Sequence, residues 1–262
     1  MDALRQMEAI CVTAALACYA ASVVCLPLKR LKRIGWITFA AGFAAESAGI
    51  ISRSIHCGHV ALQGLYDVFL WLSALMFILA VLGRRFCGLR RPAADALVAL
   101  ILITPVCLVF DPSARPLPPA LQSPLFVPHV VTYMLAYVVL FRAGIESARL
   151  AVIGGGDHQD ERTISILVKI GFPLLTAGLL LGAWWGHRIW GDFWNFDPKE
   201  LWSLATWGVF AAYLHALTVW KSAHSRLLAW LGAAGGVCII ITLVWVNLAG
   251  RLFPSLHAHA NL

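Results

Sequence analysis

Histidine and tryptophan are the residue types in this chain whose number and spacing could support chemistry. The 262 residues include nine histidines and eleven tryptophans, and six of the tryptophans fall within residues 184–207. A neutral imidazole can ligate a metal ion. An indole offers a flat apolar face with one N–H donor. What these side chains can do depends on the elements that carry them.

The composition shows which kind of element that must be. Hydrophobic residues make up 60% of the chain and charged residues 13%, and the mean hydropathy is +0.80. Soluble domains average about 45–50% apolar and about 25% charged residues. The sequence therefore excludes an ordinary soluble domain, a disordered protein and a disulfide scaffold. It predicts an all-α polytopic membrane protein, in which a net charge of +7 reflects loops and not nucleic-acid binding.

About 20 consecutive apolar residues are needed to cross a bilayer as a helix. Eight runs of suitable length are present, so we expect about eight transmembrane helices in one transmembrane domain over residues 1–262. The predicted spans are about 7–28, 34–51, 65–82, 93–110, 126–148, 164–185, 200–220 and 227–250.

Lysine and arginine predict the orientation of these spans. Thirteen of them fall on one side and six on the other, with Lys169 inside a span. The positive-inside rule then places both termini outside the cytoplasm. The outer segments are about 52–64, 111–125 and 186–199, followed by the tail 251–262. Five prolines in 111–125 predict an extended loop.

Six of the nine histidines share the outer face in this topology. His129 opens the fifth span just after Pro128, and His257 follows the eighth span by a few residues. Two neutral imidazoles from two helix ends can ligate haem iron axially. Interfacial histidines that hydrogen-bond to water or headgroups are the other interpretation. The six are His56, His59, His129, His187, His257 and His259.

His215 differs because it lies inside the seventh span. It follows Glu200 by 15 residues, roughly 22 Å along a helix, and an ionisable group at such a depth indicates a functional site. A neutral imidazole hydrogen-bonded to a neighbouring helix would also explain it. Leu204, Trp207 and Ala211 should share its face.

A membrane-interface belt explains Trp184 and Trp185 well. It explains less well the segment 190–197, where Trp190, Trp194 and Phe196 alternate with small or polar residues. Such flat faces on a loop suit a flat apolar ligand such as a porphyrin.

The sequence Asp197-Pro198-Lys199-Glu200 has a structural explanation of its own. It reads as a capping box that starts the seventh helix, with Asp197 as N-cap and Glu200 three residues on.

Residues 190–207, followed by Tyr213-Leu214-His215, closely resemble the WWD region of the CcsA/ResC family of System II cytochrome c biogenesis. Segments 128–137 and 246–257 resemble those around the outer histidines of the family, and 58–67 more loosely resembles an upstream segment. Phe196 stands where family members usually have Trp. Residues 251–254 add length before the last histidine, which leaves His257 and His259 open as the ligand.

The resemblance implies haem b as the ligand. His129 and His257 would bind its iron at an outer site on the WWD loop, about residues 184–207, with Trp190, Trp194, Phe196 and Asp197 nearby. His215 would serve a second haem site within the membrane. No residue of the chain is assigned as catalytic.

The resemblance also implies partners and a location. They are a CcsB/ResB-type membrane protein, a CxxCH apocytochrome c as substrate, and the lipid bilayer. The chain would be a haem-delivering subunit of a cytochrome c synthase in the bacterial inner (plasma) membrane, with the WWD loop facing the periplasm or exterior. A HemX-like haem-binding regulator or scaffold without ligation chemistry is the alternative. A quinol-linked electron-transfer subunit fits less well, because only His215 lies deep in a span.

Overall fold

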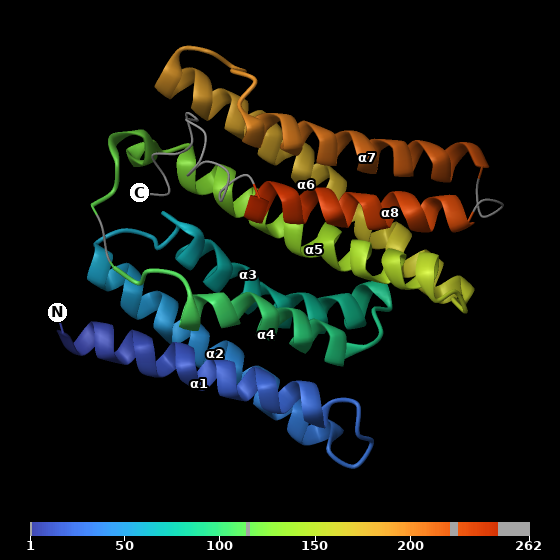
Figure 1. Ribbon diagram of the computed structural model, residues 1–262, viewed down its shortest axis with the longest axis horizontal. Coiled ribbons are helices and arrows are strands. Elements are labelled where there is room, and N and C mark those ends of the chain that lie inside the picture. The colour runs from blue at the N-terminus through green and yellow to red at the C-terminus, as the bar shows by residue number, and fades with distance from the viewer. Residues whose placement is uncertain (1, 114–115, 221–224, 246–262) are drawn as a thin grey trace. The chain divides into compact units, whose positions relative to one another are not determined.

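A computed structural model describes residues 2–113, 116–220 and 225–245, in which helices are joined by loops and no strand occurs (Figure 1). The prediction of an all-α chain is confirmed over these ranges. The chain divides into two compact units, Met1–Leu117 and Pro118–Leu262.

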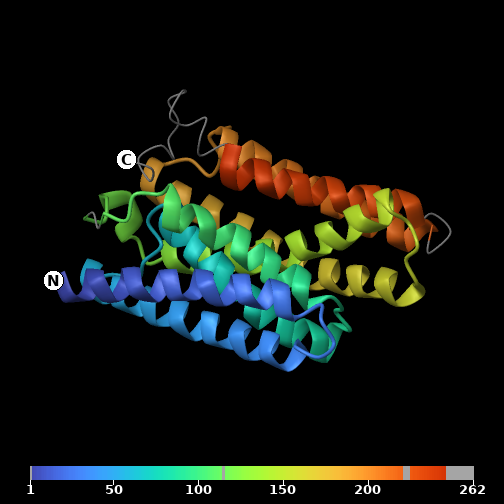
Figure 2. The same ribbon diagram turned by 60° about the horizontal axis from the view of Figure 1, so that its bottom comes forward.

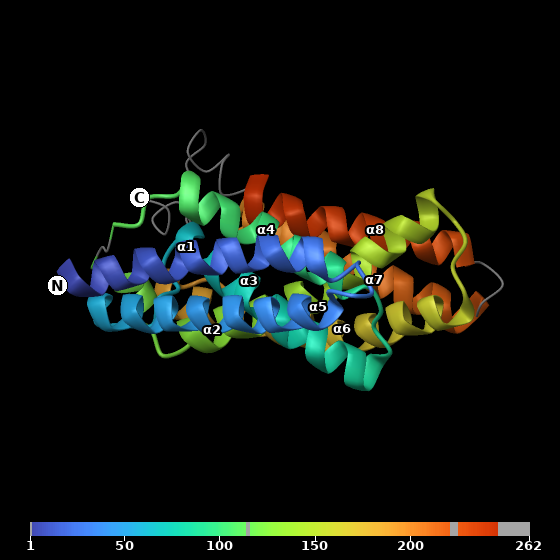
Figure 3. The same cartoon turned by 90° about the horizontal axis from the view of Figure 1, so that it is seen from below.

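Unit 1 contains four long helices. Helix α1 packs against α2 and α4, and α3 packs against the same two; α1 and α2 lie side by side along most of their length (Figure 3). Its core includes the fully buried Phe39 and Leu70. The elements are α1 (Asp2–Cys25), α2 (Lys32–Cys57), α3 (Leu65–Leu82), the π-helical turn η1 (Gly83–Cys87) and α4 (Pro92–Leu108).

The described part of unit 2 also has four long helices, with α5 packed against α6 and α8, and α7 packed against the same two. The α5–α6 connection lies at one end of this unit and the α6–α7 connection at the other (Figure 2). The elements are the 3₁₀ turn η2 (Pro119–Gln122), α5 (Phe126–Val152), α6 (His158–Trp190), α7 (Pro198–Trp220), α8 (Ser225–Ile240) and the π-helical turn η4 (Ile241–Trp245).

Six segments in the described ranges are long and apolar enough to cross a membrane, and α4 is a shorter apolar helix. Each of the eight predicted spans overlaps a helix within the described ranges, where the last span can be followed as far as Trp245. The chain is therefore a polytopic helical protein suited to a membrane, while the orientation of its termini and its organisation as a single transmembrane domain stay predictions.

The helix ends differ from those predicted. Helix α6 continues to Trp190, so the predicted outer loop 186–199 shrinks to 191–197. Helix α2 continues to Cys57, past the predicted end at residue 51. The expectation that 111–125 is extended is wrong at Pro119–Gln122, which form a 3₁₀ turn. Hydropathy measures the hydrocarbon-spanning part of a helix, whereas backbone hydrogen bonding continues into the interface.

Helices α5 and α8 contact each other at a glycine on each helix. A Cβ built on Gly144 would lie 2.8 Å from the Cα of Gly236, so no larger residue fits there without a shift. Small residues at a crossing let two backbones approach closely, which is a common means of joining membrane helices. The α5–α8 pair is thus held by direct backbone contact.

Unit 1 buries a carboxyl group between its helices. Glu46 of α2 is fully buried and accepts a hydrogen bond from the hydroxyl of Tyr19 at 2.6 Å. Ser73 of α3 also contacts its carboxyl group. One side chain thereby links α1, α2 and α3, and such interhelical bonds help join helices where the surroundings are apolar.

Candidate functional site

The half-buried His129, near the start of α5, is held by the backbone of α6. Its Nδ1 lies 3.0 Å from the carbonyl oxygen of Gly178. A carbonyl only accepts, so Nδ1 carries the hydrogen and a neutral ring keeps its lone pair on Nε2. Metal-ligating histidines are commonly oriented by such a second hydrogen bond. The geometry therefore suits Nε2 of His129 for axial ligation of iron.

Aromatic rings fix the plane of this imidazole. Trp185 stacks on His129 with ring centroids 5.8 Å apart and an interplanar angle of 15°, and Tyr133 meets the same imidazole edge to face at 5.1 Å. Trp185 is itself packed against Phe126, and its indole N–H donates to the carbonyl of Ala120 at 3.1 Å. The interpretation of Trp185 as an interface-belt residue is therefore wrong, because it is 5% exposed and supports His129.

Two glycines of α6 make room for these rings. A Cβ at Gly182 would lie 2.6 Å from Cε1 of His129, and one at Gly178 would lie 2.7 Å from the ring of Tyr133. Our sequence interpretation missed both positions. Their four-residue spacing, which puts them on one helix face, is a signal that could have found them.

The loop 191–197 carries exposed aromatic rings. It begins at Gly191, which ends α6 in a left-handed conformation with φ of 88°. Phe193 stacks on the imidazole of His187 at 4.0 Å and is 58% exposed, while Phe196 is 72% exposed. Two flat apolar faces are thus available for a ligand on this loop.

In the described part of the chain, ring contacts link one of the predicted loop aromatics, but not the other two, to His129. Trp190 packs edge to face on Trp185, with centroids 4.9 Å apart, and so lies one ring away from the imidazole. Trp194 is half-buried, and no ring contact joins it or Phe196 to His129 within the described residues. Of the three predicted loop aromatics, Trp190 is therefore the one that the structure joins to His129, through the ring of Trp185.

The capping-box interpretation of 197–200 is confirmed. Asp197 is buried and its Oδ1 accepts from the backbone N–H of Lys199 at 2.9 Å. Glu200 Oε2 accepts from the N–H of Asp197 at 3.3 Å and from that of Asn195 at 2.8 Å. These bonds satisfy donors at the start of α7 and fasten the end of the loop.

His215 is exposed on α7, and no hydrogen bond from its ring occurs within the described part of the chain. The structure therefore lends no support to an imidazole hydrogen-bonded to a neighbouring helix of unit 2. On the predicted shared face, Leu204 is also exposed, whereas Trp207 packs on Phe172 and donates to Thr176 at 2.9 Å. The second predicted ligand, His257, and its alternative His259 lie outside the described residues.

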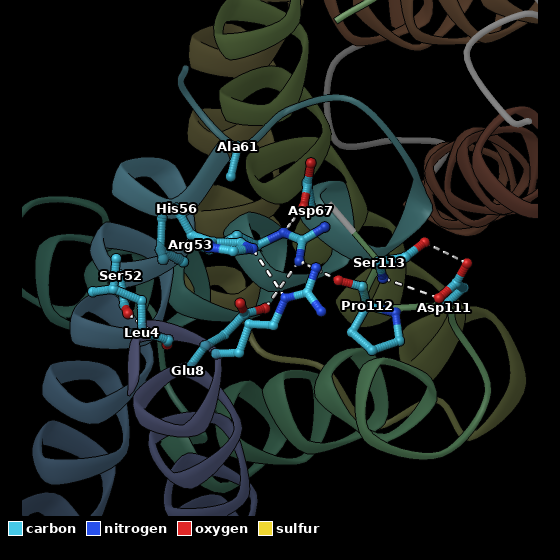
Figure 4. Close-up of polar contacts among 12 residues, drawn as sticks. Leu4, Glu8, Ser52, Arg53, His56, Ala61, Asp67, Asp111, Pro112 and Ser113 are labelled. Atoms are coloured by element: carbon cyan, nitrogen blue, oxygen red, sulfur yellow. Dashed lines mark hydrogen bonds and ion pairs between the residues drawn. The ribbon is translucent and has the colours of Figure 1, made fainter. Parts of the chain in front are cut away.

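A polar cluster in unit 1 was missed by our sequence interpretation (Figure 4). Buried Arg53 of α2 pairs with Glu8 of α1 at 3.0 Å, pairs with Asp67 of α3, and donates to the carbonyl of Pro112 at 2.8 Å. Charged residues near the ends of three apolar segments were the available signal. The cluster ties three helices to the loop that follows α4.

His56 extends this cluster, because its Nε2 accepts from Nε of Arg5 at 3.0 Å (Figure 4). A nitrogen that accepts from an arginine is already using its lone pair. His56 is therefore ill suited to ligate a metal through that atom.

A family model described as "Cytochrome C assembly protein" matches residues 62–253 of this chain. The chain belongs to the cytochrome c assembly family. Several proteins named cytochrome c biogenesis protein CcsA are similar to it over most of their length. That from Guillardia theta is 30% identical and covers 90% of each chain; that from Synechococcus sp. (strain RCC307) is 28% identical and covers 86% of this chain and 85% of its own.

Among solved structures, one titled "Cytochrome c Heme Lyase CcmF" superposes with a TM-score of 0.71 at 18% identity. The match covers 98% of this chain and half of that chain. It establishes a shared fold. The predicted membership of a CcsA-type family, and a role in cytochrome c biogenesis, are thus confirmed.

Proposed function

We propose that this chain binds haem b and presents it for covalent attachment to CxxCH apocytochromes, as a subunit of a System II cytochrome c synthase. The observation that carries the proposal is the imidazole of His129. It is fixed between the carbonyl of Gly178 and the indole of Trp185, with its lone pair on Nε2. A solved relative of the same fold is titled a haem lyase, which supports haem as the cargo.

His129 and His257 would supply the two axial ligands, so that neither face of the iron is open to oxygen chemistry. The exposed faces of Phe193 and Phe196, together with Trp190 and Trp194, would contact the porphyrin. Asp197 acts by fixing the loop end through the α7 cap.

The attachment chemistry belongs to the substrate. A deprotonated cysteine of the apocytochrome is the nucleophile. Its sulfur forms a bond to one carbon of a haem vinyl group as the vinyl double bond opens, and the other carbon takes up from solvent the proton that the thiol released. The chain's part is to hold the vinyl edges beside the thiols, which is an orientation effect.

His215, exposed on α7, would serve a second haem site within the membrane, together with a group from a CcsB/ResB-type partner. The loop 191–197 would face the periplasm or exterior of a bacterial inner membrane, as the distribution of Lys and Arg indicates.

The test is an absorption spectrum of the detergent-purified protein, co-expressed with its partner, in oxidised and reduced states. We expect a low-spin bis-imidazole spectrum of b type. It should be lost or shifted in His129→Gly and His257→Gly and kept in His158→Ala, whose side chain is fully exposed on the first turn of α6.

Added imidazole should restore the low-spin spectrum of His129→Gly, because it can replace the missing ligand. A haem spectrum indifferent to His129 and His257 would overturn the ligand assignment. Haem binding without apocytochrome attachment in the reconstituted complex would favour the HemX-like regulator.

A further inference from the structure

Unit 2 contains a cavity of about 260 Å³ at the end where the α5–α6 connection lies. All four long helices of the unit contribute to its wall. Leu150, Ile164, Leu217, Leu228 and Ala229 make the wall predominantly apolar. The volume falls just below the roughly 300–1,000 Å³ of pockets for drug-sized ligands. It suits part of an elongated apolar molecule better than a tetrapyrrole.

The inner wall carries a buried hydroxyl that lacks a partner. Ser147 of α5 is fully buried and lines the cavity, and its Oγ has no hydrogen bond within the described residues. A buried polar group in this state requires a ligand or a water to satisfy it. Tyr213 also lines the cavity, and its hydroxyl lies 3.4 Å from that of Ser165.

An arginine side chain lies at the mouth of the cavity. Arg162 is exposed there, and no ion pair of its guanidinium occurs in the described ranges. The other arginines nearby are engaged: Arg142 pairs with Glu146, and Arg149 with Glu146 and Asp160. Among the described residues that line the cavity, the other groups able to carry a charge near neutral pH are Glu161 and His158, whose Oε2 and Nδ1 lie 3.7 Å apart. Arg162 is thus the group available to an anion, and a guanidinium binds phosphate strongly.

The position of Arg162 along α6 fits the surface of a bilayer. Arg162 lies two residues before the apolar stretch 164–185, at the level where headgroups are expected to meet hydrocarbon. Tyr213 lies about one turn farther along α6, because its hydroxyl is 3.4 Å from that of Ser165, and Ser147 lines the same cavity from α5.

We infer that this cavity binds one glycerophospholipid. Its phosphate pairs with Arg162, an ester carbonyl accepts from Ser147, and the first part of one acyl chain fills the apolar wall. This site is separate from His129 and independent of haem.

The experiment is native mass spectrometry of the delipidated full chain in detergent, titrated with dioleoyl phosphatidylglycerol or with dioleoylglycerol, which lacks the phosphate. We expect one tightly held phosphatidylglycerol. Ala229→Phe, which fills the cavity, should lower its occupancy at least tenfold. Ala234→Phe, on the exposed face of the same helix, should not.

Substitution of Arg162 and of Ser147 measures separately how the phosphate and the ester carbonyl of the lipid contribute to binding. Arg162→Gln should weaken phosphatidylglycerol binding about tenfold and leave dioleoylglycerol unchanged, whereas Arg226→Gln, exposed near the same end, should alter neither. Ser147→Ala should weaken both ligands about threefold or more.

The inference is overturned if the wild-type chain retains no phospholipid, or if a folded Ala229→Phe variant binds it as well as Ala234→Phe does. Should Ala229→Phe not fold, equal binding by Arg162→Gln, Ser147→Ala and wild type overturns it. His129→Gly should keep the lipid, so this test is distinct from that of the haem site.

Discussion

The imidazole of His129 occupies space that exists because α6 carries glycine at positions 178 and 182. The ring is set by a backbone carbonyl and an indole, and both come from α6. A substitution at one of these glycines should therefore alter iron ligation by His129 although His129 itself is unchanged.

Gly182→Ala is expected to displace the His129 ring, since the new Cβ would lie 2.6 Å from Cε1. Overpacking of this kind costs about 1–3 kcal/mol. We expect a reduced low-spin fraction in the haem spectrum and a lower midpoint of thermal unfolding.

Gly208→Ala of α7 is the matched control, because nothing lies within 4 Å of its added Cβ and Ala favours a helix. If the Gly182→Ala variant has the same haem spectrum as the Gly208→Ala variant, the imidazole is not confined as described.

At this scale the sequence predicted His129 as a ligand candidate but not the residues that hold it. The position of His129 at the start of a helix, directly after Pro128, is visible in the sequence. That Trp185 would turn inward, and Trp184 outward at 47% exposure, depends on the rotation of α6 against α5. Two adjacent tryptophans carry no local signal that distinguishes them.

At the scale of elements, the start of α7 determines where the aromatic loop ends. Asp197 and Glu200 hold three backbone donors between Asn195 and Lys199. The carboxylate of Asp197 could serve as a cap or as a charge near the haem, and these two roles respond differently to substitution.

Asp197→Ala should lower the free energy of unfolding by about 1 kcal/mol, whereas Asp197→Asn should leave it nearly unchanged, because Asn caps as well as Asp. Thermal unfolding and the haem spectrum should be measured on the same samples. If Asp197→Asn lost the haem spectrum at an unchanged melting midpoint, the negative charge itself would be required.

The eight helices were predictable because each carries its own apolar run, and a run is a local property. The residues at which the helices end were harder to predict. Trp184 to Trp190 contains no proline and meets no left-handed residue until Gly191, so hydrogen bonding continues past the apolar stretch. Arg53 fell in a segment assigned to a loop, although its partners Glu8 and Asp67 keep it buried inside unit 1.

For the molecule as a whole, the orientation in the membrane rests on the distribution of Lys and Arg. In a cysteine-free background, Asp192→Cys and Ile153→Cys place one thiol at each end of unit 2; both positions are exposed. A membrane-impermeant maleimide should label residue 192 in intact cells and residue 153 only after permeabilisation.

The reverse labelling pattern would invert the topology and put the aromatic loop in the cytoplasm. Equal labelling of both positions in intact cells would contradict a spanning arrangement of α6.

The glycine contact between α5 and α8 has a mechanical consequence. Two helices joined backbone to backbone at Gly144 and Gly236 have no side chains to repack between them there, so they should move as one stiff piece. His129 belongs to that piece, because it lies in the first turn of α5. Under the proposed function, the iron ligand His129 would therefore sit on a rigid support formed by two helices, and its ring would not shift independently of α8.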